Sequence, residues 1–206
     1  LDANTTGSNN VAVGRYALTT STTGYSNVAV GYATAYSITT GFNNTAMGES
    51  ALNANTTASN NTAVGQTSMY YNTTGANNTA VGVNSLKGNT TASNNTAVGN
   101  DSLNSNTTGA ENVGIGRYAL TTNTTGANNV AMGYNSLGAN TTASNNTAIG
   151  FRSLQTNTTG TYNAAVGASA LTANTTGGSN TAMGQGSGYT NTTGGFNTFL
   201  GYDARG

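Results

Sequence analysis

A 17-residue period runs through this chain and constrains its fold more than any other feature. Thr-Thr followed by Gly or Ala begins at Thr5 and returns every 17 residues, without insertion or deletion, until Thr192. This gives twelve units, of which the first starts at Asn4 and the last ends one residue short at Gly206. A fixed short period is typical of a solenoid, in which each unit is one coil and buries its core against its neighbours. Residues 1–206 are therefore expected to form a single repeat array.

Numbering each unit from its first residue gives seventeen places with different rules. Thr fills places two and three, Ala nearly always fills place nine, and place ten holds Val, Met, Ile or Leu. Two rows have no exceptions, and both are predicted to be structural ladders. We expect each Asn at place seven to hydrogen-bond its copies in adjacent coils, and each Gly at place eleven to supply a positive φ or a close backbone approach. The rows are Asn10, Asn27, Asn44, Asn61, Asn78, Asn95, Asn112, Asn129, Asn146, Asn163, Asn180 and Asn197, and Gly14, Gly31, Gly48, Gly65, Gly82, Gly99, Gly116, Gly133, Gly150, Gly167, Gly184 and Gly201.

The residue types in each unit favour strands over helices. Gly costs about 1 kcal/mol in a helix interior, Asn and Thr are poor helix formers, and no 3.6-residue apolar stripe occurs. Places eight to ten form a short β-favouring run that ends at a Gly. The prediction is an all-β protein, a parallel β-solenoid of twelve 17-residue coils. A second short strand is expected from place fourteen onward or at the Thr-Thr pair.

Alternation along the predicted strand assigns its side chains to two faces. Places eight and ten share one face, because side chains of a strand point alternately to either side. We expect the branched residues at place ten to form the core row, opposite the Leu that usually fills place fifteen. The Ala at place nine would then point outward and offer a flat flank on which copies of the chain could pack. Coils about 4.8 Å apart would make a rod about 58 Å long.

The charge balance and the missing residue types exclude several kinds of chemistry. Five Lys and Arg balance five Asp and Glu, so nucleic-acid binding has no electrostatic footprint. No apolar run approaches the ~20 residues of a membrane-spanning helix, so membrane insertion is not expected. The chain has no His and no Cys, and its carboxylates lie in different coils. We therefore expect no catalytic, cofactor or metal site, no cofactor, and no enzymatic activity.

Aromatic residues gather at the variable places twelve and thirteen, which we expect to form an exposed ridge. They are candidate contacts for a sugar or for another protein: Tyr16, Tyr32, Tyr118, Tyr134, Phe151 and Tyr202. Near the C-terminal end, Leu at place fifteen gives way to Gly188 and Arg205, and Ala at place nine gives way to Phe199. Residues 174–206 are therefore predicted to be degenerate terminal coils or a junction.

The core pattern of Ser or Asn, Asn, Val or Thr, Ala, an aliphatic residue and Gly resembles known repeats. It stands at residues 9–14, 43–48 and 145–150. It resembles the head repeats of YadA-like trimeric autotransporter adhesins and similar repeats of phage tail fibres, although the 17-residue coil is longer than the usual adhesin coil. The resemblance implies a left-handed β-roll, a side-by-side homotrimer, an extracellular, cell-surface or virion location, and a host-surface protein or glycan as receptor.

Three functions remain open from the sequence. The first is a non-catalytic structural or adhesive rod of an extracellular fibre, which mediates attachment or spacing. The second is an ice-binding solenoid that uses ranks of Thr, although adjacent Thr residues send only one rank outward. The third is a subunit of an end-to-end extracellular filament. Asn-Thr-Thr, a glycosylation sequon, occurs ten times, which favours a bacterial or phage origin.

Overall fold

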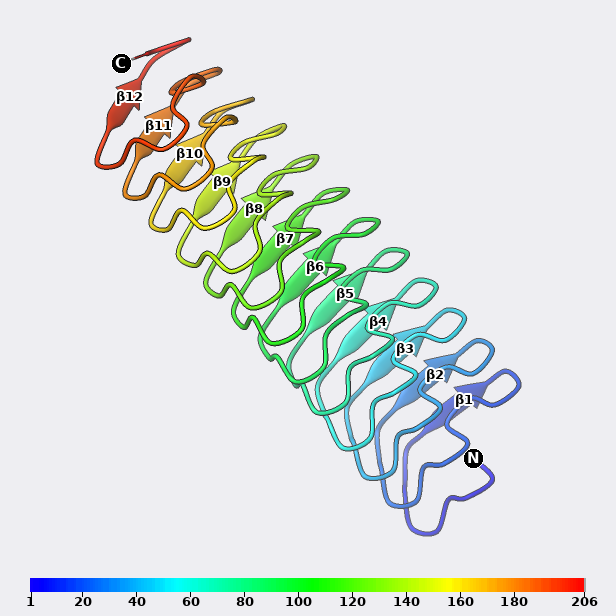
Figure 1. The fold of residues 1–206 in the computed structure, drawn as a ribbon. Helices are drawn as coiled ribbons and strands as arrows, with labels where there is room; N and C mark the ends of the chain where they lie inside the picture. Colours follow the sequence, from blue (N-terminus) through cyan, green and yellow to red (C-terminus); the bar gives the residue numbers. More distant parts are fainter. Residues whose placement is uncertain (206) are drawn as a thin grey trace.

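The computed structural model describes residues 1–205 and forms a β-solenoid with its termini at opposite ends (Figure 1). Each coil contributes one three-residue strand, and no helix occurs within the described range. The all-β parallel solenoid with strands at a 17-residue spacing is therefore confirmed. The twelve strands form one parallel sheet in sequence order: β1 (Val11–Val13), β2 (Val28–Val30), β3 (Thr45–Met47), β4 (Thr62–Val64), β5 (Thr79–Val81), β6 (Thr96–Val98), β7 (Val113–Ile115), β8 (Val130–Met132), β9 (Thr147–Ile149), β10 (Ala164–Val166), β11 (Thr181–Met183) and β12 (Thr198–Leu200).

The register of the sheet stacks each place on its own copy. In β4 and β5, for example, Ala63 pairs with Ala80, one coil later. The same spacing continues outside the strands, where the N–H of Thr73 donates to the carbonyl of Thr90 at 2.9 Å. Those segments are bends and turns, so the predicted second strand is wrong. Left-handed residues interrupt the extended backbone there, although hydrogen bonding between coils continues.

Place nine, and not place ten, faces the interior. Ala63 and Ala80 are fully buried, whereas Val13 and Met47 are 56% and 43% exposed. The prediction that place ten forms the core and place nine an outer flank is therefore wrong. The reason is the narrow cross-section, because the inward Leu of place fifteen leaves room only for a methyl group opposite. At Gly114, which lacks that methyl, an added Cβ would lie 3.2 Å from the Leu103 Cγ.

The inward leucines require an unusual backbone. Leu86 has φ of 51° and Leu103 has φ of 51°, both in the left-handed region, and the other leucines of place fifteen share this conformation. This conformation costs an L-residue roughly 1–2 kcal/mol. Burial of a Leu side chain contributes about 1.5–3 kcal/mol, which offsets the cost. The row of leucines is thus held by packing and not by local preference.

The last coils keep the register and change only their side chains. Strands β11 and β12 pair as the others do, with Ala182 opposite Phe199. A Cβ on Gly188 would lie 2.8 Å from the Phe199 Cδ2, so the phenyl ring occupies space near the missing Leu side chain. In most other coils the core combines a large residue at place fifteen with Ala at place nine, and Ala35 and Gly114 are the exceptions. Here the two sizes are exchanged.

The described residues contain no helix able to cross a membrane.

Candidate functional site

The asparagines of place seven form a continuous ladder along the rod. From Asn27 to Asn197, each donates its backbone N–H to the side-chain Oδ1 of the Asn one coil earlier, at 2.9–3.1 Å. Most also use the side-chain amide, as where the Asn78 Nδ2 donates to the Ala92 carbonyl at 2.9 Å. One Asn therefore links its own coil to both neighbouring coils. The row acts in the fold, although the Asn95 Nδ2 is buried without a hydrogen-bond partner.

The glycines of place eleven stack with equal regularity. Their φ values lie between 113° and 139°. A Cβ on Gly133 would lie 2.5 Å from the Gly150 carbonyl oxygen, and the other glycines from Gly14 to Gly184 make similarly close approaches. Only a residue without a side chain allows the coils to approach this closely.

A second polar ladder, not predicted from the sequence, runs along places one and two. Each Thr of place two, from Thr5 to Thr175, donates its Oγ1 to the carbonyl of the next such Thr at 2.9–3.4 Å. The place-one asparagines from Asn89 to Asn191 donate Nδ2 to the preceding Oδ1 at 2.7–3.3 Å. Ile38 interrupts this row, and the Ser21 hydroxyl one coil earlier is buried without a partner. The invariance of place two was the signal that could have revealed this ladder.

Burial of these asparagines leads to a prediction about expression. Asn72 and Asn89 are the acceptors of Asn-Thr-Thr sequons, yet both are fully buried. N-linked sugar would replace a hydrogen on the Nδ2 that donates to the Gly75 carbonyl in Asn72. A eukaryotic secretory route should therefore yield glycosylated, misfolded chain, measured by mass spectrometry and circular dichroism. Tunicamycin should restore the folded form, and folded protein with sugar on Asn72 would contradict the prediction.

The outward side of the twelve-stranded sheet forms a surface that was not predicted from the sequence. It carries no charged residue and consists mainly of Thr and branched apolar side chains. One feature of the sequence could have indicated which side of the sheet faces outward: the small Ala of place nine fits in an interior that already holds the large Leu row. We name it the strand face, and its residues are Val11, Val13, Val28, Val30, Thr45, Met47, Thr62, Val64, Thr79, Val81, Thr96, Val98, Val113, Ile115, Val130, Met132, Thr147, Ile149, Ala164, Val166, Thr181, Met183, Thr198 and Leu200.

The structure gathers five of the six predicted aromatic contacts into two groups. The rings of Tyr16 and Tyr32 are 5.7 Å apart. Tyr118 lies 6.0 Å from Tyr134, which in turn stacks on Phe151 at 5.5 Å.

Tyr202 lies apart from both groups and lines a shallow pocket with Tyr189 and Asp203. Three arginines that were not predicted from the sequence each lie over a ring of these groups: Arg15, Arg117 and Arg152. Because each Arg is next to its ring in the sequence, the Arg-Tyr and Phe-Arg pairs were a usable signal.

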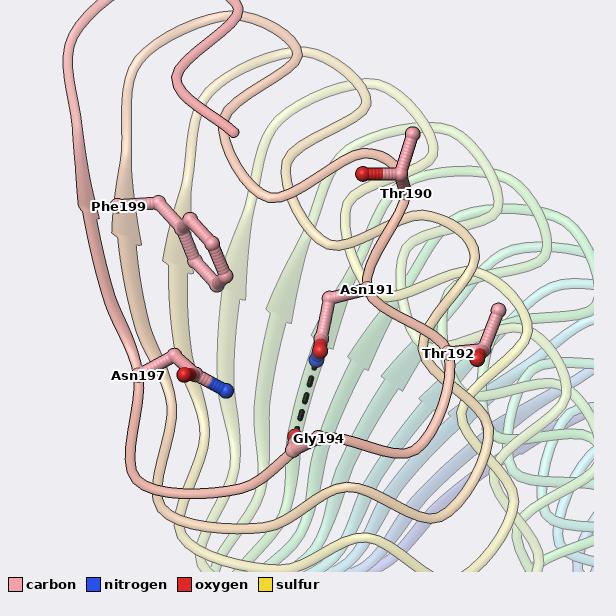
Figure 2. Close-up of a pocket in the computed structure, with 6 residues that line it drawn as sticks. All are labelled: Thr190, Asn191, Thr192, Gly194, Asn197 and Phe199. Carbon is pink, nitrogen blue, oxygen red and sulfur yellow. Dashed lines mark hydrogen bonds between the residues drawn. The ribbon is translucent and has the colours of Figure 1, made fainter. Parts of the chain in front are cut away.

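A pocket at the C-terminal end is the interior of the last coil. Figure 2 shows Asn191, Asn197 and Phe199 pointing into it. The Asn191 Nδ2 donates to the Gly194 carbonyl at 3.0 Å, as in the other coils. The residues that line the pocket occupy the places that contact the next coil elsewhere in the rod. The pocket therefore follows from the stacking.

Metal-binding groups and ion pairs are sparse in residues 1–205. No cluster of three or more His, Cys, Asp or Glu side chains occurs in that range. Its one ion pair joins Arg205 to Asp203 at 2.8 Å. Few charged side chains on this rod are therefore candidates for binding a ligand, and the main ones are Arg15, Arg117 and Arg152.

Comparisons with protein families, with curated proteins and with solved structures give no match. The class of protein is thus defined by the structure itself. It is a tandem-repeat parallel β-solenoid with a core of Leu and Ala, polar ladders of Asn and Thr, an uncharged strand face, and a ridge of aromatic and arginine side chains.

Proposed function

We propose that this chain is a non-catalytic structural and adhesive rod of an extracellular fibre, in which three copies associate side by side. The strand face is the observation that carries the proposal. It presents a continuous row of Val, Met, Ile and, at the last coil, Leu200 along the whole rod, and many of these side chains are more than a third exposed. The number three and the location on a cell surface or virion come from the resemblance to adhesin heads and tail fibres.

The size of the strand face supports association. A three-residue strand is about 10 Å long, and twelve strands extend over about 58 Å, which gives about 600 Å² in projection. The largest exposed apolar patch of a typical monomer is about 300–600 Å² and often functional. A standard interface buries about 800 Å² per partner, so this face together with its flanks is close to what stable association needs. Copies in register would place identical coils side by side.

Charge on the strand face should dissociate the assembly. We expect the unmodified chain to have about three times its monomer mass of 20.4 kDa in light scattering. Val64→Lys with Val98→Lys would bury two unpaired ammonium groups in each copy, and should give a folded monomer. Thr57→Lys with Thr91→Lys adds the same charge at exposed place-three positions and should keep the trimer.

Two results would contradict this assignment. One is a monomeric unmodified chain, and the other is full assembly of the Val64→Lys, Val98→Lys variant. Circular dichroism of each variant establishes that its coils remain folded, so that a loss of assembly is not mistaken for a loss of fold.

The ice-binding alternative has weaker support from the side-chain geometry. The hydroxyls of the place-two threonines donate to backbone carbonyls, as Thr73 does to Thr90 at 2.9 Å. Between the two terminal coils, only place three of the Thr-Thr pair is exposed, as at Thr57 and Thr74. On the strand face the Thr of place eight alternates with an aliphatic residue, so it gives no paired Thr rank. The end-to-end filament stays a prediction.

A further inference from the structure

Five side chains on coils seven to nine form a continuous array, which we name the aromatic ledge: Arg117, Tyr118, Tyr134, Phe151 and Arg152. The Arg117 guanidinium carbon lies 4.5 Å from the Tyr118 ring centre. The three rings follow at 6.0 and 5.5 Å, and the Arg152 guanidinium carbon lies 4.9 Å from the Phe151 centre. The ledge therefore runs along the rod with a cation at each end.

Both arginines keep most of their hydrogen-bonding capacity. Within residues 1–205, neither lies within 4.0 Å of a carboxylate oxygen, since the single ion pair there is that of Arg205. The Arg117 Nη2 donates to the Tyr118 hydroxyl at 2.7 Å, and the Arg152 guanidinium makes no hydrogen bond in the same range. A guanidinium has five N–H donors, which match the two oxygens of a carboxylate or sulfate. Stacking on a ring holds each guanidinium in place while its edge stays available.

We propose that the aromatic ledge binds an acidic polysaccharide, through carboxylate or sulfate groups on the arginines and sugar rings against the aromatic side chains. Charge complementarity selects an anion, because the ledge carries two positive charges without a paired acid. Its linear course along the rod suits a chain polymer more than a compact ligand. This inference specifies the ligand of the attachment role and so rests on the proposed function.

A related group six coils earlier would strengthen binding to a long polymer. Arg15 lies over the Tyr16 ring at 4.5 Å, and Tyr32 and Tyr36 lie within 6.3 Å of that ring. Six coils correspond to about 29 Å along the rod. A polymer that spans this distance could contact both groups at once, and the second contact would form at a high effective concentration.

Binding to dextran sulfate, with neutral dextran as the uncharged comparison, tests the proposal. We expect the intact protein to bind dextran sulfate and polygalacturonate at low salt, and to release both as NaCl rises. Arg117→Gln with Arg152→Gln should weaken binding about tenfold or more. Lys87→Gln with Arg205→Gln removes the same net charge away from the ledge and should change binding less than threefold. This control measures how far net charge alone affects the affinity.

Aromatic contacts are tested separately. Tyr134→Ala should weaken binding, whereas Tyr162→Ala, which removes an exposed ring elsewhere, should not. Equal binding of dextran and dextran sulfate would overturn the proposal, as would unchanged affinity of the double arginine variant or no binding at all. Equally tight, ledge-dependent binding of duplex DNA would overturn the assignment to a polysaccharide.

Light scattering on the same samples separates this proposal from the rod proposal. A trimer that binds neither dextran sulfate nor polygalacturonate would overturn the proposal for the aromatic ledge and would still support the rod proposal. A monomer that binds them through the ledge would overturn the rod proposal and would still support the proposal for the aromatic ledge.

Discussion

Replacing Gly133 with Ala is expected to lower the free energy of unfolding by about 2 to 6 kcal/mol, which is the sum of the costs of backbone strain and of overpacking. Gly133 has φ of 132°, a conformation that Ala rarely adopts. Its new Cβ would lie 2.5 Å from the Gly150 carbonyl oxygen and 2.7 Å from the carbonyl carbon. Because both atoms belong to the backbone of the next coil, no side chain can move aside and the coils must separate.

Gly201→Ala is the matched control for this variant. Gly201 has φ of 113°, yet a Cβ there would meet nothing within 4 Å. It therefore reports the backbone strain without the clash. Urea unfolding followed by circular dichroism should show a clearly larger loss for Gly133→Ala, and hydrogen exchange should become faster in coils eight and nine. Equal midpoints for the two variants would contradict the close-approach explanation.

The exchanged core pair at the C-terminal end should show strong coupling. Phe199→Ala alone is expected to cost about 3 kcal/mol, because it empties the space beside Gly188. Gly188→Leu alone should cost about 1–3 kcal/mol, because its Cβ would lie 2.8 Å from both Leu171 and Phe199 side-chain atoms. The double variant restores the Leu and Ala arrangement of most other coils. It should therefore be more stable than the sum of the single effects by about 1–3 kcal/mol.

Hydrogen exchange in residues 181–200 of these three variants measures the coupling where it acts. Protection of β11 and β12 should fall in each single variant and largely return in the double variant. The left-handed backbone supports this design, since Gly188 has φ of 64° and the other residues of this row, such as Leu171 at 49°, tolerate similar values. Additive losses in the double variant would show that the two positions do not share one space.

The sequence predicted the solenoid because a strict period leaves few other ways to bury apolar side chains. It did not predict which strand face was buried, because alternation relates the two faces without assigning either. Apolarity favoured Val64 over Ala63 as the core residue, but the interior beside Leu52 and Met69 admits only a methyl group. Available volume, which depends on the closed coil, decided the orientation.

The ridge illustrates a similar limit. Tyr134 and Phe151 share a place and so could be expected to stack. The contact of Tyr118 with Tyr134 joins neighbouring places on different coils, and depends on side-chain directions that the repeat does not define. The sequence places Arg117 and Arg152 next to aromatic residues, but only the structure places them at the two ends of one row of rings.

The residue-for-residue register of the sheet also makes length a discrete property of this protein. Ala97 meets Gly114 one coil later in the same way that Ala80 meets Ala97. Removing or adding one 17-residue unit in the middle would therefore rejoin equivalent surfaces and change the rod by one step of about 4.8 Å. Unequal recombination between repeats would therefore change the length of the rod by whole coils, while the register between coils is kept.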